Sequence, residues 1–289
     1  MRSFLVKIFK FLMLLPVLWL LVIVLVLPFY ERLPEVHNGD DAVFIWGDSQ
    51  LYRGLNLSLM SELTNLDIQS AARHGAGTYD FLIFAQAVPA SSTVVISVSK
   101  TAQLRRKSKD RNMSGISIDA MVRLYDLGYS PSDLLRIVIK NPKPKMIFEK
   151  TNKLYAVGEP SFTKTDSLLF ESVYASIPNF AEVKQSAYIQ GIKILLAKDC
   201  RILFLDYPYH SMLRAIEKKS PVKKVTDSFS TDLIELVDFE RFDTLTLPNR
   251  DFLMHDYTHL DQAGADLVTE KVAEVLSVTS EEHVYIQID

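Results

Sequence analysis

The stretch from Ala42 to Gln50 constrains the fold more than any other, because it combines a strand, a tight turn and a helix start. Residues 43–46 are apolar, Gly47-Asp48-Ser49 is a turn tripeptide, and residues 51–63 carry apolar side chains at helical spacing. Further strand-like segments follow at 66–70, 93–98 and 201–207, with a small one at 237–239. Strands that alternate with helices predict a mainly parallel α/β sheet with right-handed crossovers.

Helical patterns separate these strands. They are predicted at 51–63, 79–88, 116–127, 131–139, 181–197, 211–219, 229–236 and 261–276. Thr78 is a candidate N-cap for the helix that ends before Pro89. The less regular stretch 112–180 is interpreted as an insertion in the α/β domain and a candidate lid.

The N-terminus contains an uncharged run of 18 residues, 11–28, which is just long enough to cross a bilayer. Basic residues precede it, so the positive-inside rule predicts a cytoplasmic N-terminus at 1–10 and a transmembrane signal anchor at 11–30. A linker at 31–39 would then lead to an extracytoplasmic domain at 40–289, in the periplasm or at the cell surface. The alternative is a cleaved signal peptide, which the length of the run and the lack of a small-x-small site disfavour.

Composition excludes some classes of function. The net charge is −3, which gives no reason to expect a nucleic-acid partner. The chain has 1 cysteine, Cys200, so it cannot form an intrachain disulfide, and an apolar neighbourhood predicts a buried structural thiol. No Cys/His cluster suggests a metal site. The basic segment 105–109 is interpreted as a solvated surface loop, with an anionic glycan or lipid headgroups as alternative partners.

Ser49 stands where a serine nucleophile is useful, at the end of a strand and the start of a helix. Such a hydroxyl needs a base, and a carboxylate that orients the base. His259 and Asp256 lie three residues apart in a segment before the last predicted helix. Among the other histidines, the best rival as base is His210, with His74 and His255 also open.

These two segments resemble the first and last sequence blocks of the SGNH (GDSL-like) hydrolases. The first block is matched by Gly47-Asp48-Ser49, and the last by 256–260 with Gly264 shortly after. The resemblance implies a three-layer α/β/α sandwich with a mainly parallel sheet. It also implies a catalytic triad of Ser49, Asp256 and His259, with no cofactor and no metal.

The family's oxyanion hole is only partly matched. It uses the N–H of the nucleophile, here Ser49, and a glycine N–H after the second strand, for which Gly75 and Gly77 are both candidates. It also uses an asparagine after the third strand, and that block is missing here. Ser99 stands near the corresponding position, and its hydroxyl or the neighbouring Lys100 could donate in its place.

An SGNH-like domain behind one membrane helix resembles proteins of cell-envelope polysaccharide O-acetylation. This architecture implies a membrane-anchored serine esterase or O-acyltransferase that acts on an ester-bearing glycan or another acylated substrate, beside a multi-span acyltransferase. Two alternatives remain open. The domain could be a non-catalytic glycan-binding or assembly subunit, or it could be a lipase or thioesterase with an apolar groove beside Ser49.

Overall fold

The computed structural model describes most of the central domain and little of the N-terminus. The described residues are 9–10, 13–18, 36, 42–74, 76–97, 117–134, 148–156, 187–206, 229, 231–238 and 259–277. The predicted anchor at 11–30 therefore lies largely outside them, although residues 13–18 are helical. Within the described ranges, no helix is both long and apolar enough to cross a bilayer. The anchor stays a prediction.

The centre of the domain is a five-stranded sheet in the order β2-β1-β3-β4-β5, and every neighbouring pair of strands is parallel. The strands are β1 (Ala42–Trp46), β2 (Asp67–Ser70), β3 (Thr93–Ser97), β4 (Arg201–Asp206) and β5 (Ile234–Asp238). This confirms the predicted parallel α/β fold. Because the strands run in one direction, their carboxyl ends meet at one edge of the sheet, where open α/β folds build their sites.

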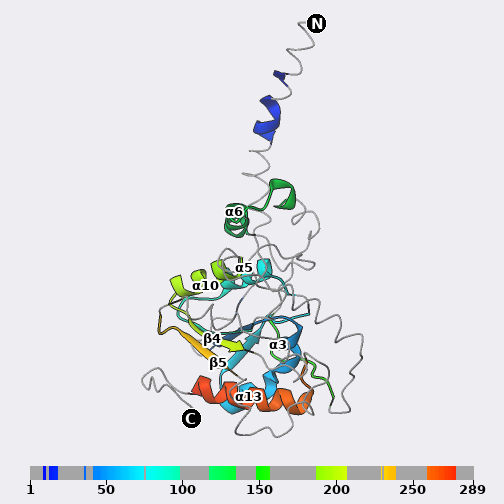
Figure 1. Cartoon of the computed structure of the whole chain (residues 1–289), viewed down its shortest axis with the longest axis vertical. Helices are drawn as coiled ribbons and strands as arrows, with labels where there is room; N and C mark the ends of the chain where they lie inside the picture. Colours follow the sequence, from blue (N-terminus) through cyan, green and yellow to red (C-terminus); the bar gives the residue numbers. More distant parts are fainter. Residues whose placement is uncertain are drawn as a thin grey trace, which may run out of the picture.

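Helices cover both faces of the sheet and complete three layers (Figure 1). One face carries α5 (Thr78–Ala87) and α10 (Ala187–Ala197), and the other carries α3 (Ser49–Gly54), α4 (Leu57–Thr64) and α13 (Gln262–Ser277). Alternate side chains of β1 enter the two cores, as Phe44 and Trp46 do on the first face. A strand buried on both faces explains why the apolar run of β1 is continuous rather than alternating.

The core on the α5 and α10 face is aromatic and closely packed. The ring of Phe81 lies 4.6 Å from that of Trp46 and 4.7 Å from that of Tyr188, centroid to centroid. Gly191 on α10 allows this approach, because a Cβ there would lie 2.5 Å from the Phe81 ring. The two helices therefore pack around an aromatic cluster that a larger residue at 191 would disturb.

The predicted helix at 51–63 is wrong as a single element, since it is two helices, α3 and α4. Leu55 and Asn56 between them have extended backbone. Asn56 starts α4 as its N-cap, with a side-chain oxygen that accepts a hydrogen bond from the Leu59 N–H at 3.2 Å. Apolar side chains continue across the break because α3 and α4 pack into the same core, so periodicity alone could not reveal it.

The predicted helix at 229–236 is also wrong, because residues 234–238 form β5. Pairing with β4 overrides the local pattern, and Arg201 on β4 bonds Glu235 on β5 at 2.6 Å. A smaller error concerns Thr78, which is the first residue of α5, while Gly77 occupies the N-cap position. Local propensity is a weak guide wherever a neighbouring strand offers backbone hydrogen bonds.

Two described parts of the predicted insertion pack against different elements of the domain. Helix α6 (Ile118–Asp126) buries Ala120 and Leu124 in the same core as α5 and α10. The segment 148–156 instead joins the sheet edge, where Glu149 makes an antiparallel bridge with Ser70 of β2. The interpretation of 112–180 as a lid stays a prediction, since most of it lies outside the described residues.

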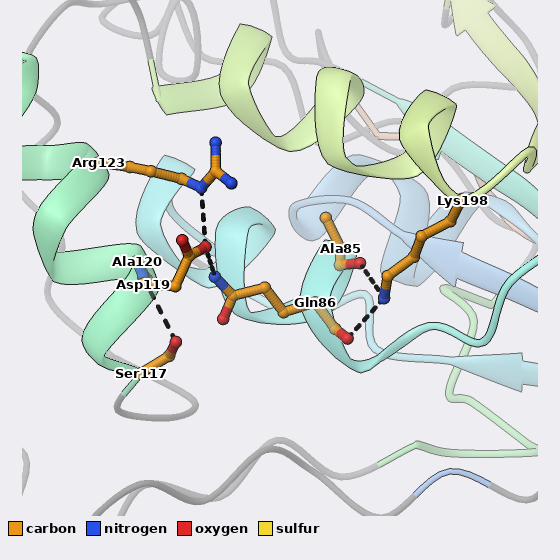
Figure 2. A network of polar contacts seen from close by, with 7 residues as sticks. All are labelled: Ala85, Gln86, Ser117, Asp119, Ala120, Arg123 and Lys198. Carbon is orange, nitrogen blue, oxygen red and sulfur yellow. Dashed lines mark hydrogen bonds and ion pairs between the residues drawn. The ribbon is translucent and has the colours of Figure 1, made fainter.

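Polar contacts join the C-terminal end of α5 to its neighbours (Figure 2). Lys198 donates from Nζ to the carbonyl oxygens of Ala85, Gln86 and Val88 at 3.0, 2.7 and 2.7 Å. These carbonyls lie at the end of the helix and have no intrahelical partners, so the ammonium group supplies their hydrogen bonds. Its positive charge also interacts favourably with the negative end of the helix dipole. Partial burial of the Lys198 ammonium group lowers its pKa.

We expect Lys198→Met to lower the free energy of unfolding by about 1–3 kcal/mol, because it leaves part-buried carbonyl oxygens without donors. Urea unfolding followed by circular dichroism measures the change. Lys193→Met on the exposed side of α10 is the matched control and should change stability by less than about 0.5 kcal/mol. Equal losses in both variants would contradict a specific capping role for Lys198.

Candidate active site

The structure brings together the two side chains that the sequence separates by 210 positions. The His259 Nε2 atom lies 3.0 Å from the Ser49 Oγ atom, within hydrogen-bond distance. Both side chains are half-buried at the carboxyl edge of the sheet, Ser49 on the first turn of α3 and His259 just before α13. This is the distance that a serine nucleophile and its base require.

Ser49 is held by a rigid turn. Asp48 is the N-cap of α3, and its side chain accepts a hydrogen bond from the Gln50 N–H at 3.0 Å. Gly47 is required because a Cβ there would lie 2.6 Å from the Leu51 Cβ atom. The Gly47 carbonyl also accepts the Arg73 N–H at 3.1 Å, which joins the turn to the segment after β2. Gly47 therefore has a steric reason, and Asp48 a capping reason, for its place before Ser49.

His259 is held by the start of α13. Leu260 is buried in the core shared with α3 and α4, and Asp261 is 1% exposed. The Asp261 side chain accepts a hydrogen bond from the Gly264 N–H at 2.9 Å, which is an N-terminal cap. The position of His259 is therefore set by an anchored leucine and a capped helix immediately after it.

Asn56, the N-cap of α4, connects the Ser49 side of the site to the His259 side. Its Nδ2 atom donates to the Asp266 Oδ1 atom at 2.7 Å, and its backbone N–H donates to the Thr269 hydroxyl at 2.8 Å. Asp266 and Thr269 both belong to α13. The unpredicted helix break thus fixes α3 relative to α13, and with them the serine relative to the histidine.

The segment 148–156 forms one wall of the site. Asn152 donates to the carbonyl oxygens of Tyr52 and Leu55 at 2.5 and 2.7 Å, and so caps the end of α3. Three residues later, the ring of Tyr155 meets the His259 ring edge to face, with centroids 5.7 Å apart. An aromatic side chain against the imidazole restricts its rotation and excludes water from one side.

Arg53 lies one helical turn after Ser49 and contacts the same wall. Its guanidinium carbon is 4.8 Å from the centroid of the Tyr155 ring and 5.4 Å from that of Tyr52. Its Nη1 atom donates to the Lys153 carbonyl at 2.6 Å, and its Nε atom donates to the His74 Nε2 atom at 3.3 Å. These contacts hold the positive charge in a defined place beside the candidate nucleophile.

His74 must be neutral to accept the hydrogen bond from Arg53. Its pKa is lowered from 6.5, first by desolvation, then by the charge of Arg53 and then by that of His259. A lowered pKa means that the unfolded chain binds more protons than the folded one. The stability that depends on neutral His74 is therefore present above pH 6.5 and is lost as the pH falls through the pKa of the folded state.

Of the candidate side-chain and glycine donors to the oxyanion, the structure describes only Gly77. The Gly77 N–H donates to the Asp80 carboxylate at 3.2 Å, and that carboxylate is buried and paired with Arg73 at 2.6 Å. Because the Gly77 N–H already donates to a side chain of α5, this geometry argues against it as an oxyanion donor. Gly75, Ser99 and Lys100 lie outside the described residues, as does the proposed triad carboxylate, Asp256.

Sequence reasoning missed the residues that build the wall of the site. Tyr155 and Asn152 lie in a stretch without periodicity, and neither carries a motif. Arg53 could have been noticed, because it follows Ser49 by four positions where a helix is predicted to start, and residues four apart on a helix lie on the same side. From the sequence, His74 is only a rival base, whereas in the structure it accepts a hydrogen bond from Arg53. Cys200 is buried, and burial raises the pKa of its thiol, as expected of a structural cysteine.

Comparisons with known proteins add little to this geometry. No protein-family model matches the chain. No curated protein sequence matches it significantly. Among solved structures, it is similar to a candidate SGNH hydrolase from Slackia heliotrinireducens, with 13% identity and a TM-score of 0.41 over 82% of this chain and 98% of the other.

Two further solved structures are similar at the same level. A lipase, Lip_vut3, from a goat rumen metagenome has 11% identity and a TM-score of 0.42 over 83% of this chain and 99% of its own. An acetyl xylan esterase, Est2A, from Butyrivibrio proteoclasticus has 9% identity and a TM-score of 0.35 over 84% of this chain and 65% of its own. Likenesses this distant carry no argument about chemistry, which is therefore drawn from the site.

We expect an NMR titration to place the pKa of His74 below 6.5, and Arg53→Gln to raise it by removing a nearby positive charge. Arg123→Gln, which removes an arginine from α6, should leave the His74 pKa unchanged. A His74 pKa at or above 6.5 in the unmodified chain would contradict both the desolvation and the contact with Arg53.

Proposed function

We propose that this protein is a serine esterase or O-acyltransferase that forms an acyl-enzyme on Ser49. The observation that carries the proposal is the 3.0 Å separation of the Ser49 Oγ and His259 Nε2 atoms. A hydroxyl at this distance from an imidazole can lose its proton as it attacks. The defined positions of both residues, set by Asp48 on one side and Asp261 on the other, support the same conclusion.

The reaction would proceed in two steps. In the first, Ser49 Oγ forms a bond to the ester carbonyl carbon while His259 Nε2 takes its proton, and the alcohol leaves with that proton. In the second, water or an acceptor hydroxyl gives its proton to His259 and attacks the acyl-enzyme, and Ser49 Oγ leaves with the proton. Asp256 would orient His259 through the other ring nitrogen, and the Ser49 N–H would donate to the oxyanion.

Water as acceptor makes the protein a deacylase, and a sugar hydroxyl makes it a transferase. We propose an ester-bearing carbohydrate of the cell envelope as the substrate, by resemblance to envelope O-acetylation proteins. A multi-span acyltransferase would be the partner that delivers or receives the acyl group. Both proposals rest on the membrane-anchored architecture expected from the sequence.

Replacement of the nucleophile tests the serine chemistry. In the full chain, we expect Ser49→Ala to lower kcat for 4-nitrophenyl acetate by about 10³-fold or more and to abolish labelling by a fluorophosphonate. Ser58→Ala, which removes an exposed hydroxyl from α4, should behave as the unmodified protein. Turnover and labelling that persist in Ser49→Ala would refute the assignment. Well-folded protein with neither activity would favour a domain that only binds glycan.

The anchor has its own test. We propose that residues 11–30 hold the protein in the membrane with residues 40–289 outside the cytoplasm, since the uncharged run follows basic residues. The full chain should stay in the membrane pellet after a carbonate wash, and external protease should digest the domain in spheroplasts. Release of a chain shortened at its N-terminus would instead indicate a cleaved signal peptide.

A further inference from the structure

Arg53 differs from the other arginines that the structure describes. Arg73, Arg123 and Arg201 each pair with a carboxylate, at 2.6, 2.7 and 2.6 Å. Arg53 pairs with no carboxylate among the described residues. Its contacts there are a carbonyl oxygen, a histidine ring and two tyrosine rings. A half-buried guanidinium among neutral groups retains its charge for a further partner.

The place of this charge is defined relative to the reaction centre. Arg53 follows Ser49 by one turn of α3, so the two side chains lie on the same side of that helix. Tyr155 connects them, because its ring contacts the Arg53 guanidinium at 4.8 Å and the His259 ring at 5.7 Å, and His259 bonds Ser49. The cation, the aromatic ring, the histidine and the nucleophile are therefore joined by one series of contacts.

The contacts of Arg53 also leave some of its N–H donors available to a ligand. The Nη1 atom is directed to the Lys153 carbonyl, and the Nε atom to His74, while no described residue accepts a hydrogen bond from Nη2. An arginine has five N–H donors in a fixed plane, which suits an anion with two oxygens. Holding the side chain in place before the substrate arrives lowers the entropy lost on binding.

We propose that Arg53, framed by Tyr52 and Tyr155, binds a carboxylate on the ester substrate and so makes this site selective for anionic esters. The inference rests on the proposed ester chemistry at Ser49 and adds a substrate class to it. Selectivity follows because a neutral ester leaves the guanidinium without its counter-charge, whereas a carboxylate completes it.

Two pairs of esters, each differing by one negative charge, test the inference in the full chain. The first pair has the charge on the acyl group: 4-nitrophenyl hydrogen glutarate against 4-nitrophenyl methyl glutarate. The second has it on the alcohol: 3-acetoxybenzoate against 3-acetoxybenzamide. We expect kcat/KM to favour the anionic member of at least one pair by about tenfold or more, and the pair that responds shows on which side the carboxylate lies.

Variants distinguish a specific effect of Arg53 on the preference for anionic esters from an effect of the overall charge of the protein. Arg53→Gln should remove most of the preference, and Arg53→Lys should restore only part, because lysine lacks the planar pair of donors. Arg123→Gln removes the same charge from α6 and should keep the full preference. Equal preference in Arg53→Gln and the unmodified protein, or no preference in either pair, would overturn the inference while leaving the esterase proposal intact.

A binding measurement keeps the inference testable if no ester is turned over. In Ser49→Ala, the ring signals of His74 should shift on addition of 3-acetamidobenzoate and not of 3-acetamidobenzamide, or on addition of monomethyl glutarate and not of dimethyl glutarate, since His74 contacts Arg53 directly. The shift should disappear when Arg53→Gln is added. Saturable binding in Ser49→Ala, together with no ester turnover by the unmodified protein, would support the anionic subsite and contradict the esterase. Equal responses to the charged and the neutral member of both pairs would contradict the subsite.

Discussion

Parallel pairing of β1 with both β2 and β3 is the constraint on which the rest of this structure depends. It places the turn after β1 and the segment after β2 at one edge, where the Arg73 N–H bonds the Gly47 carbonyl. It also buries β1 on both faces, so that helices must pack on either side. The candidate site lies where these elements meet, so the pairing of the strands fixes the relative positions of its parts.

A second level of organisation comes from polar side chains that join elements distant in sequence. Asn56 fixes the α3–α4 break to α13, and Asn152 fixes the segment 148–156 to the end of α3. Each amide satisfies backbone or side-chain groups that a helix end would otherwise leave unpaired. The same contacts set the distance between Ser49 and His259 and hold Tyr155 beside them.

The residues around the reaction centre bear on substrate choice more than the serine and histidine themselves do. A serine and a histidine in contact can serve many ester chemistries. Beside them, the guanidinium of Arg53 contacts two tyrosine rings and donates a hydrogen bond to His74, which must be neutral to accept it. Substrate choice would therefore depend on Arg53 of α3 and Tyr155 of the segment 148–156, and the bond-breaking step on Ser49 and His259.

The sequence by itself determined the parallel α/β architecture and the positions of Ser49 and His259, because strand periodicity, the Gly-Asp-Ser turn and the start of α13 are local signals. Only the tertiary structure decided that residues 234–238 join the sheet, since pairing with β4 outweighs helical propensity. It alone brought Arg53, His74 and Tyr155 together, because contacts between distant segments depend on packing and leave no periodic trace in the chain.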